Sequence, residues 1–222
     1  VSPNGSSSNT GSKSSPWDFA SALDGTKSIA PGSTIKFLPG VYGNNIAYDV
    51  KIAGSSGNKI NIEAEDVTKQ GSVKVKGQFY LKPPATYLKF EGFEFYNEGT
   101  GDSTAYAVGL WLESGDSIHI VNNVIHDGAI GIADWAVARY TKIHGNIIYN
   151  IGWLDNVRSH GHCIYTQNDF VNGIKEYKHN YFYSKFGSTH TGGSLGISAY
   201  SKSKGVENYV VDENHIYASV YM

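Results

Sequence analysis

A short pattern of apolar and polar positions recurs along the second half of the chain. Each copy begins with Asn, continues through an apolar residue at the third position, and then carries an aromatic ring or His. The third-position residues are Phe95, in a forerunner that lacks the Asn, and Ile125, Ile148, Phe182 and Ile216. A fixed strand-like segment at unequal intervals predicts a solenoid, in which the coils stack while the loops between strands vary in length.

Two further apolar columns can be aligned with the first. One lies three residues before the Asn position and contains Phe90, Ile120, Ile143, Tyr177 and Val211. The other belongs to strands between the copies and contains Leu110, Ile132, Ile164 and Ile197. We therefore expect each coil to contain at least two short strands, stacked in parallel on neighbouring coils, with alternate side chains outside.

The start of the chain predicts a different element. Pro16 in a first turn, with Ser15 as N-cap, and an apolar stripe up to Leu23 predict one short helix that closes the end of the stack. Residues 1–15 are rich in Ser, Gly and Asn and predict a flexible arm. The expected fold class is thus all-β, with one solenoid domain over residues 16–222 and a short N-terminal capping helix.

Composition narrows the function classes. The chain has 222 residues, and its net charge of −2 gives no basic surface for nucleic acid. Its apolar runs are only strand-sized, so no membrane span is expected. Cys163 is the single cysteine, so an internal disulfide is excluded. No basic and apolar leader opens the sequence, so we expect that any export signal has already been removed.

These features together resemble a known group of proteins. The segments involved are Pro16–Leu23, the opening from Pro31 to Tyr42, the repeated Asn motif, and His160–Asn168. The chain resembles the right-handed parallel β-helix proteins of the pectate-lyase-like group, and His160–Asn168 resembles a segment of exported bacterial β-helix proteins. The resemblance implies a right-handed parallel β-helix, a secreted or cell-surface location, and a polysaccharide or other glycan as partner.

The repeated asparagines are assigned to structure. An Asn side chain tolerates left-handed turns, and its amide can bond to the amide of the next coil. The predicted internal ladder contains Asn123, Asn146, Asn180 and Asn214. The aromatic residues and His126 that follow in the motif are expected to stack on one another beside this corner.

The strands between the copies are the better place for a ligand. Their outward side chains combine large rings with carboxylate and amide groups, which suits a sugar chain with apolar ring faces and hydroxyl edges. The alternative is that side loops cover the rings. The candidate substrate-binding residues are Trp111, Glu113, Trp135, Tyr165, Gln167 and Tyr200.

A loop before one of these strands carries the candidate catalytic residues Asp155, Arg158, His160 and His162. Arginine can clamp a uronate carboxylate with two parallel hydrogen bonds, and histidine can transfer protons near neutral pH. The alternative is a local ion pair between Asp155 and Arg158, with both histidines bonded only to the backbone.

The metal signal is weak. His160 and His162 could bind zinc together, but a third ligand such as Asp155 is only assumed. Calcium needs several oxygen ligands, and Asp134, Asp155 and Asp169 are scattered. We therefore expect no metal and no cofactor, with calcium left open.

Two functions remain. The first is an extracellular protein that binds a polysaccharide and that could also cleave it, as a lyase or a glycoside hydrolase. The second is a non-catalytic extracellular scaffold, adhesin or filament subunit that assembles through the ends of the solenoid. The second follows from the last residues, which stop within a coil, so either further coils or another molecule would cover that edge.

Overall fold

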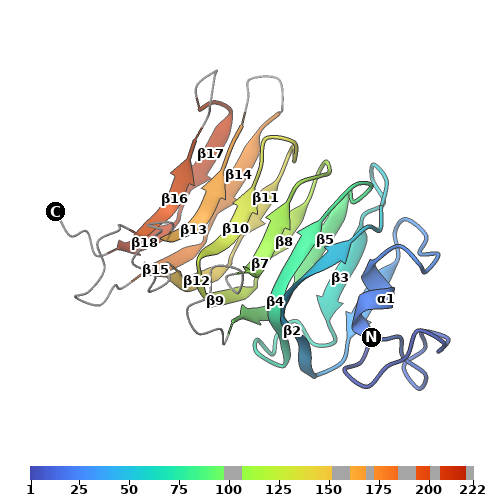
Figure 1. Ribbon diagram of the computed structural model, residues 1–222. Helices are drawn as coiled ribbons and strands as arrows, with labels where there is room; N and C mark the ends of the chain where they lie inside the picture. The colour runs from blue at the N-terminus through green and yellow to red at the C-terminus, as the bar shows by residue number, and fades with distance from the viewer. Residues whose placement is uncertain (98–106, 152–160, 169–172, 185–193, 201–205, 219–222) are drawn as a thin grey trace.

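The structure is a computed structural model that describes residues 1–97, 107–151, 161–168, 173–184, 194–200 and 206–218. Its strands pair in parallel and stack along one axis, from the helix α1 at one end to β17 and β18 at the other (Figure 1). Seven strands form one sheet and eleven form a second sheet. The predicted all-β parallel solenoid is confirmed.

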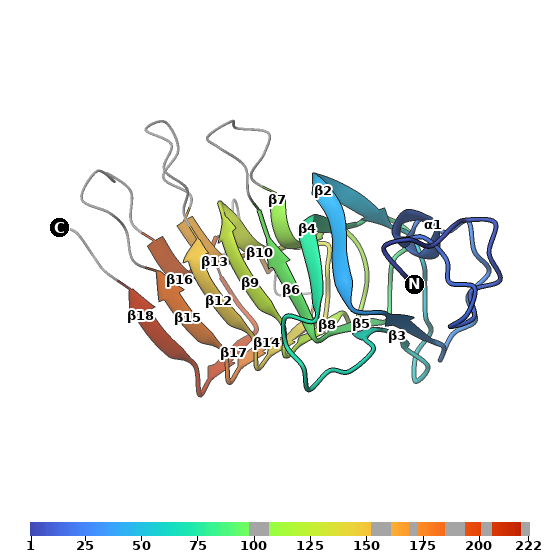
Figure 2. The same ribbon diagram turned by 90° about the horizontal axis from the view of Figure 1, so that it is seen from below.

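The coil has three faces, which Figure 2 shows from a second side. Face 1 contains β1 (Thr34–Phe37), β3 (Ile60–Ala64), β5 (Leu88–Glu91), β8 (His119–Val121), β11 (Lys142–His144), β14 (Lys175–Lys178) and β17 (Tyr209–Asp212). Face 2 contains β6 (Phe93–Tyr96), β9 (Val124–Gly128), β12 (Ile147–Ile151), β15 (Tyr181–Ser184) and β18 (His215–Ala218). Face 3 contains β7 (Ala107–Leu112), β10 (Ile130–Asp134), β13 (Gly161–Thr166) and β16 (Ser194–Ala199).

The two long strands β2 (Gly40–Val50) and β4 (Val73–Leu81) join faces 2 and 3. The first part of β4 pairs with β6, and its second part pairs with β7. The corner falls at Gly77, whose φ of 119° is in the region that favours glycine. A Cβ there would also lie 2.2 Å from the carbonyl oxygen of Ile46, so the two coils approach each other more closely than a side chain allows.

The three apolar columns predicted from the sequence are in register. Ile125 pairs with Ile148 and Phe95, and Ile132 pairs with Leu110 and Ile164. Most members are fully buried, so each coil covers the core of its neighbour. The column members in the last described coil are more exposed, with Val211 at 51% and Ile216 at 54%.

The asparagines form a ladder at the corner between faces 1 and 2. The Oδ1 atom of Asn146 accepts hydrogen bonds from the backbone N–H (3.0 Å) and the side-chain amide (3.1 Å) of Asn123. Asn180 does the same for Asn146, and Asn214 for Asn180. Each of these amides also donates to a backbone carbonyl. The ladder therefore satisfies polar groups that the sharp turn would otherwise leave buried and unpaired.

The helix α1 (Phe19–Leu23) is shorter than predicted, and the proposed N-cap is wrong. Asp18 is the N-cap, because its carboxylate accepts hydrogen bonds from the backbone N–H (2.9 Å) and the hydroxyl (2.6 Å) of Ser21. Ser15 instead forms a turn with Ser12. The expected flexibility of residues 1–15 stays a prediction, although Leu38 donates to the carbonyl of Val1 at 2.9 Å.

In the described part of the chain, no helix has the length and apolar character that crossing a membrane requires.

Candidate functional site, an aromatic ridge on face 3

Face 3 carries two outward columns of side chains. The first column contains Asp49, Tyr80, Trp111, Ala133, Tyr165 and Ser198, which pair across successive coils. The second column lies just beyond the strand ends and contains Lys82, Glu113, Trp135, Gln167 and Tyr200. Strand alternation explains this arrangement, because the residues between these positions point into the core.

Four rings from the two columns form a continuous row, which we call the aromatic ridge: Tyr80, Trp111, Trp135 and Tyr165. Consecutive ring centroids lie 6.2, 5.3 and 5.2 Å apart, at interplanar angles of 82°, 46° and 63°. All four side chains are partly exposed. Because the rings are tilted against one another, a neighbour covers only part of each ring face.

Polar groups accompany the ridge. The indole N–H of Trp111 donates to Glu113 at 3.0 Å, and the amide of Gln167 donates to the hydroxyl of Tyr165 at 3.5 Å. The Nε1 atom of Trp135 is buried and has no hydrogen-bond partner among the described residues. Burial and the Glu113 carboxylate raise the pKa of the Tyr80 phenol to about 12, so this hydroxyl keeps its proton at neutral pH.

The ridge ends near a positively charged group. The ammonium of Lys82 lies 4.5 Å from the centroid of the Tyr80 ring. Lys82 and Lys51 each contact the Asp49 carboxylate at 2.8 Å. Hydrogen bonds from Lys51 and Lys82 lower the pKa of Asp49, which therefore stays ionised. This end of the ridge therefore carries two ammonium groups, Lys51 and Lys82, together with the carboxylates of Asp49 and Glu113, so its charges balance.

The structure places one of the predicted catalytic residues beside the ridge. His162 is 7% exposed, and its ring stacks on that of Tyr165 with a centroid distance of 5.6 Å. Asp155, Arg158 and His160 lie outside the described residues. Tyr200 follows Gln167 in the second column and is 46% exposed.

Arg139 is the other of the two arginines in the sequence, and its guanidinium is paired with a carboxylate. Its Nε and Nη2 atoms both donate to the Asp116 carboxylate at 2.6 Å. This bond raises the pKa of the Arg139 guanidinium. The pair lines an open hollow of about 480 Å³ on the turns that follow face 3. A ligand carboxylate would have to displace Asp116 to reach these donors.

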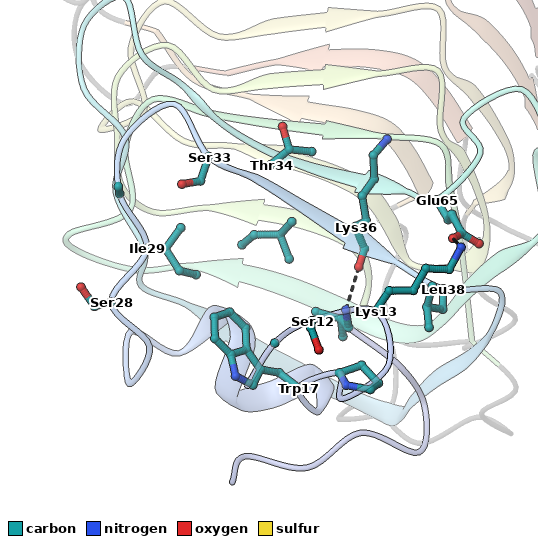
Figure 3. A pocket seen from close by; sticks show the side chains of 15 residues that line it. Ser12, Lys13, Trp17, Ser28, Ile29, Ser33, Thr34, Lys36, Leu38 and Glu65 are labelled. Carbon is teal, nitrogen blue, oxygen red and sulfur yellow. Dashed lines mark hydrogen bonds and ion pairs between the residues drawn. The ribbon is translucent and has the colours of Figure 1, made fainter. Parts of the chain in front are cut away.

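A separate cleft of about 570 Å³ lies beside β1 (Figure 3). Trp17 lies in it, but Gly11 packs against one part of the ring and Lys27 lies 5.6 Å from its centroid. Lys13 in this cleft pairs with Glu65 at 2.5 Å. Trp17 is the one aromatic residue among the described residues that line this cleft, so the cleft has no row of adjoining rings like the ridge.

Sequence reasoning missed Tyr80 and Lys82. The signal was present, because Phe79-Tyr80-Leu81 has the same apolar alternation as Leu110-Trp111-Leu112 and pairs with it. Within the described residues, no three His, Cys, Asp or Glu side chains are grouped so that they could hold a metal ion.

No protein-family model and no curated protein matches this sequence. Solved structures do. The pectate lyase Pel9A matches with a TM-score of 0.64 and 19% identity, over 82% of this chain and 46% of that protein. A mannuronic acid specific polysaccharide family 6 lyase from human gut microbiota matches with a TM-score of 0.62 and 17% identity, over 88% of this chain and 45% of that protein.

An alginate lyase from Paenibacillus sp. str. FPU-7 gives a TM-score of 0.59 and 15% identity, over 88% of this chain and 72% of that protein. The fold is that of the pectate-lyase-like parallel β-helices. At these identities the likeness establishes the fold and not the reaction. The chain spans slightly less than half the length of the first two lyases.

Proposed function

We propose that this β-helix binds an acidic polysaccharide along the aromatic ridge. The observation that carries the proposal is the unbroken row of four partly exposed, tilted rings. Parallel strands are about 4.8 Å apart, so a row over four coils is roughly 14 Å long. That length and flatness suit several units of a polymer better than one small molecule, which usually binds in an enclosed pocket.

The two lysines at the N-terminal end of the ridge are the groups that would bind an acidic ligand. Lys51 and Lys82 both contact Asp49, and a ligand carboxylate that took the place of Asp49 would meet two ammonium groups. The fold likeness to lyases named for pectate, mannuronic acid and alginate points the same way. Their names do not identify the polymer for this chain.

Cleavage is the extension of this proposal. In β-elimination, a cation neutralises the uronate carboxylate while a base removes the proton at C5. The C4–C5 double bond forms as the glycosidic C4–O bond breaks, and the leaving oxygen takes up a proton. Arg158 would bind the carboxylate, and His160 or His162 would move the proton. His162 supports this assignment, because its ring stacks on Tyr165 of the ridge. Hydrolysis remains the alternative reaction, with Asp155 and Glu113 as the two carboxylates.

We propose that the protein works outside the cell or on its surface, where such polymers occur, and without a metal ion. Chelation tests the second point. Turnover that survives EDTA supports it, and loss that is restored by calcium would assign calcium a role.

The test of binding compares a panel of acidic and neutral polysaccharides by titration calorimetry. We expect acidic polymers to bind, with affinity that falls as salt rises, because exposed charges are screened. Trp135→Ala should weaken binding. Tyr217→Ala is the matched control, since Tyr217 is a 61% exposed ring on face 2. Equal loss in both variants, or no binding by any polymer, would contradict the proposal.

The same panel tests cleavage through the absorbance of unsaturated uronate and through new reducing ends. Lyase action gives both signals, whereas hydrolysis gives only the second. Arg158→Ala should lose more activity than Arg139→Ala, because Arg139 is held by Asp116.

The scaffold function remains the second candidate, because the edge strands of a stack of parallel coils can pair with those of another copy. End-to-end assembly predicts a concentration-dependent sedimentation coefficient that Ile216→Lys lowers. A monomer at all concentrations would remove this candidate.

A further inference from the structure

A polar cluster replaces part of the apolar core beneath the ridge. Asp134, at the end of β10, pairs in register with Leu112 of one neighbouring coil and Thr166 of the other. Lys175, at the start of β14, reaches the same point from face 1. Both side chains are fully buried, at 0% exposure.

Every charge in this cluster has partners. The ammonium of Lys175 donates to the Asp134 carboxylate at 2.7 Å, to the Asp134 carbonyl at 3.1 Å, and to the Trp135 carbonyl at 2.9 Å. The Asp134 carboxylate also accepts from Thr141 at 3.1 Å and from Tyr177 at 2.7 Å. Burial lowers the pKa of Lys175, while Asp134 acts in the opposite direction.

Stability alone does not account for this arrangement. Removing two charges from water costs several kcal/mol per ion, and apolar replacements of similar volume are often neutral or stabilising. In the preceding coil, the apolar residue Leu112 occupies the position of Asp134. Apolar side chains in place of Asp134 and Lys175 could not donate a hydrogen bond to the Trp135 carbonyl, which Lys175 does where the chain leaves β10 and enters the ridge.

The cluster also reaches the next ring. The hydroxyl of Thr166 donates to the Asp134 carbonyl at 3.2 Å, and Thr166 directly follows Tyr165. Trp135 and Tyr165 are the two ridge rings that lie 5.2 Å apart. The backbone at Trp135 is therefore bonded to Lys175, and the residue next to Tyr165 is bonded to Asp134. One buried ion pair thus contacts the strands that carry both rings.

We propose that Asp134 and Lys175 are positioning residues, which hold Trp135 at the angle to Tyr165 that the polysaccharide requires. The proposal rests on the function proposed above. It assigns no contact between the ligand and either residue, both of which are buried.

The test is the double variant Asp134→Leu/Lys175→Met, which removes both charges together and avoids leaving one unpaired. We expect its Tm to lie above that of Asp134→Leu or Lys175→Met alone, because each single variant leaves one buried charge unpaired. Its affinity for the acidic polysaccharide should fall about tenfold. The Nε1–H resonance of Trp135 in a ¹⁵N spectrum, assigned with Trp135→Phe, should move.

Tyr177→Phe is the matched control. It removes one hydrogen bond to Asp134 but leaves the bond from Lys175 to the Trp135 carbonyl, so the resonance and the affinity should stay near wild type. A double variant that folds, binds as the wild type does and keeps the Trp135 resonance would overturn the positioning role.

The two proposals fail separately. If the wild type binds no polysaccharide, the proposed function is wrong. The Trp135 resonance alone then decides whether the ion pair positions the Trp135 ring. A shifted resonance in the double variant would still support control of the ring by the ion pair, and an unchanged one would refute it.

Discussion

Faces 2 and 3 both carry a row of rings on the outside of the same coils, but the rings are arranged differently. On face 2, Tyr96, His126 and Tyr149 stack with interplanar angles of 17° and 8°, and Tyr183 and Tyr217 stack at 13°. We call these rings the stacked row. The rings of the aromatic ridge on face 3 are instead tilted by 46° to 82°.

Side-chain size along one column accounts for part of the difference. In the stacked row, one register position carries a ring on coil after coil, and the rings cover each other's faces. On face 3 the corresponding position carries Tyr80 and Trp111 on adjacent coils, tilted by 82°, and then alternates between small and large, as Ala133, Tyr165 and Ser198. The ring of Trp135 from the second column lies between those of Trp111 and Tyr165, beside the covered Ala133.

The polar groups follow the same division. In the stacked row, His126 contacts Asp127 at 2.7 Å and Glu94 at 3.4 Å, and Lys76 lies 5.8 Å from the Tyr96 ring centroid. These groups satisfy one another. In the ridge, the Trp135 N–H lacks a partner among the described residues. Under the proposed function, a row of rings outside the β-helix would bind a polymer only where the column leaves the ring faces open.

The largest expected effect comes from the core beneath both rows. Ile148 directly precedes Tyr149 of the stacked row and points into the core, where its side chain packs against Gly131 of face 3. Ile148→Ala should lower the free energy of unfolding by roughly 2–5 kcal/mol, because it leaves a cavity. Urea unfolding measures this. A loss below that of Ile148→Val would mean that the coils do not share one core here.

The ladder should matter more to face 2 than to face 3. Asn146→Ala leaves the amide groups of Asn123 without their acceptor, and should cost roughly 1–3 kcal/mol. Thermal melts measure the loss, with Asn61→Ala on the outside of β3 as control. A neutral Asn146→Ala would show that the buried ladder does not stabilise the corner.

The ridge should respond in binding and not in stability. Trp111→Ala combined with Trp135→Ala should weaken polysaccharide binding by roughly 10- to 100-fold, which is about 1.4–2.8 kcal/mol. The Tm should change little, because both rings are partly exposed. A large fall in Tm with unchanged affinity would make the ridge a structural row like that on face 2.

The stacked row should respond in the opposite way. Tyr149→Ala removes a ring stacked at 4.6 Å on His126, and should cost about 0.5–1.5 kcal/mol beyond the loss of buried area. Polysaccharide affinity should not change. If Tyr149→Ala weakens binding as much as a ridge variant does, the distinction between the two rows is lost.

Face 1 gives the smallest effect and involves neither row. Burial, with nearby Lys59 and other cations, lowers the pKa of His119 to about 4, below its ordinary value of 6.5. The folded state therefore favours neutral His119, and stability falls as pH drops from about 6.5 towards 4. The slope should be at most about 1 kcal/mol per pH unit and smaller in His119→Gln. Identical slopes would show that His119 titrates normally.

The fold was predictable because the core columns repeat. Ile125, Ile148 and Phe182 stand at the same motif position, and only stacked parallel coils bring them into one column. The helix start was not predictable in the same way. Ser15 and Asp18 are both good N-caps by residue type, and the choice depended on which of them could reach a backbone N–H.

The polar cluster shows the opposite case, in which the signal was available and not used. Asp134 is two residues after the inward Ile132, and Lys175 is two residues before the inward Tyr177. Strand alternation alone therefore places both inside. Their pairing could not be derived, because it depends on two strands of different faces meeting across the core.

The ridge carries one ring per coil, so the positions of its rings repeat at a fixed interval along the axis. This interval is the rise between parallel strands, about 4.8 Å, and no side-chain substitution alters it. For a polymer with a different repeat, the offset between its units and the rings would grow with each coil. Under the proposed function, the polymer's own repeat would therefore limit how many consecutive units can each meet a ring, however many coils the surface has.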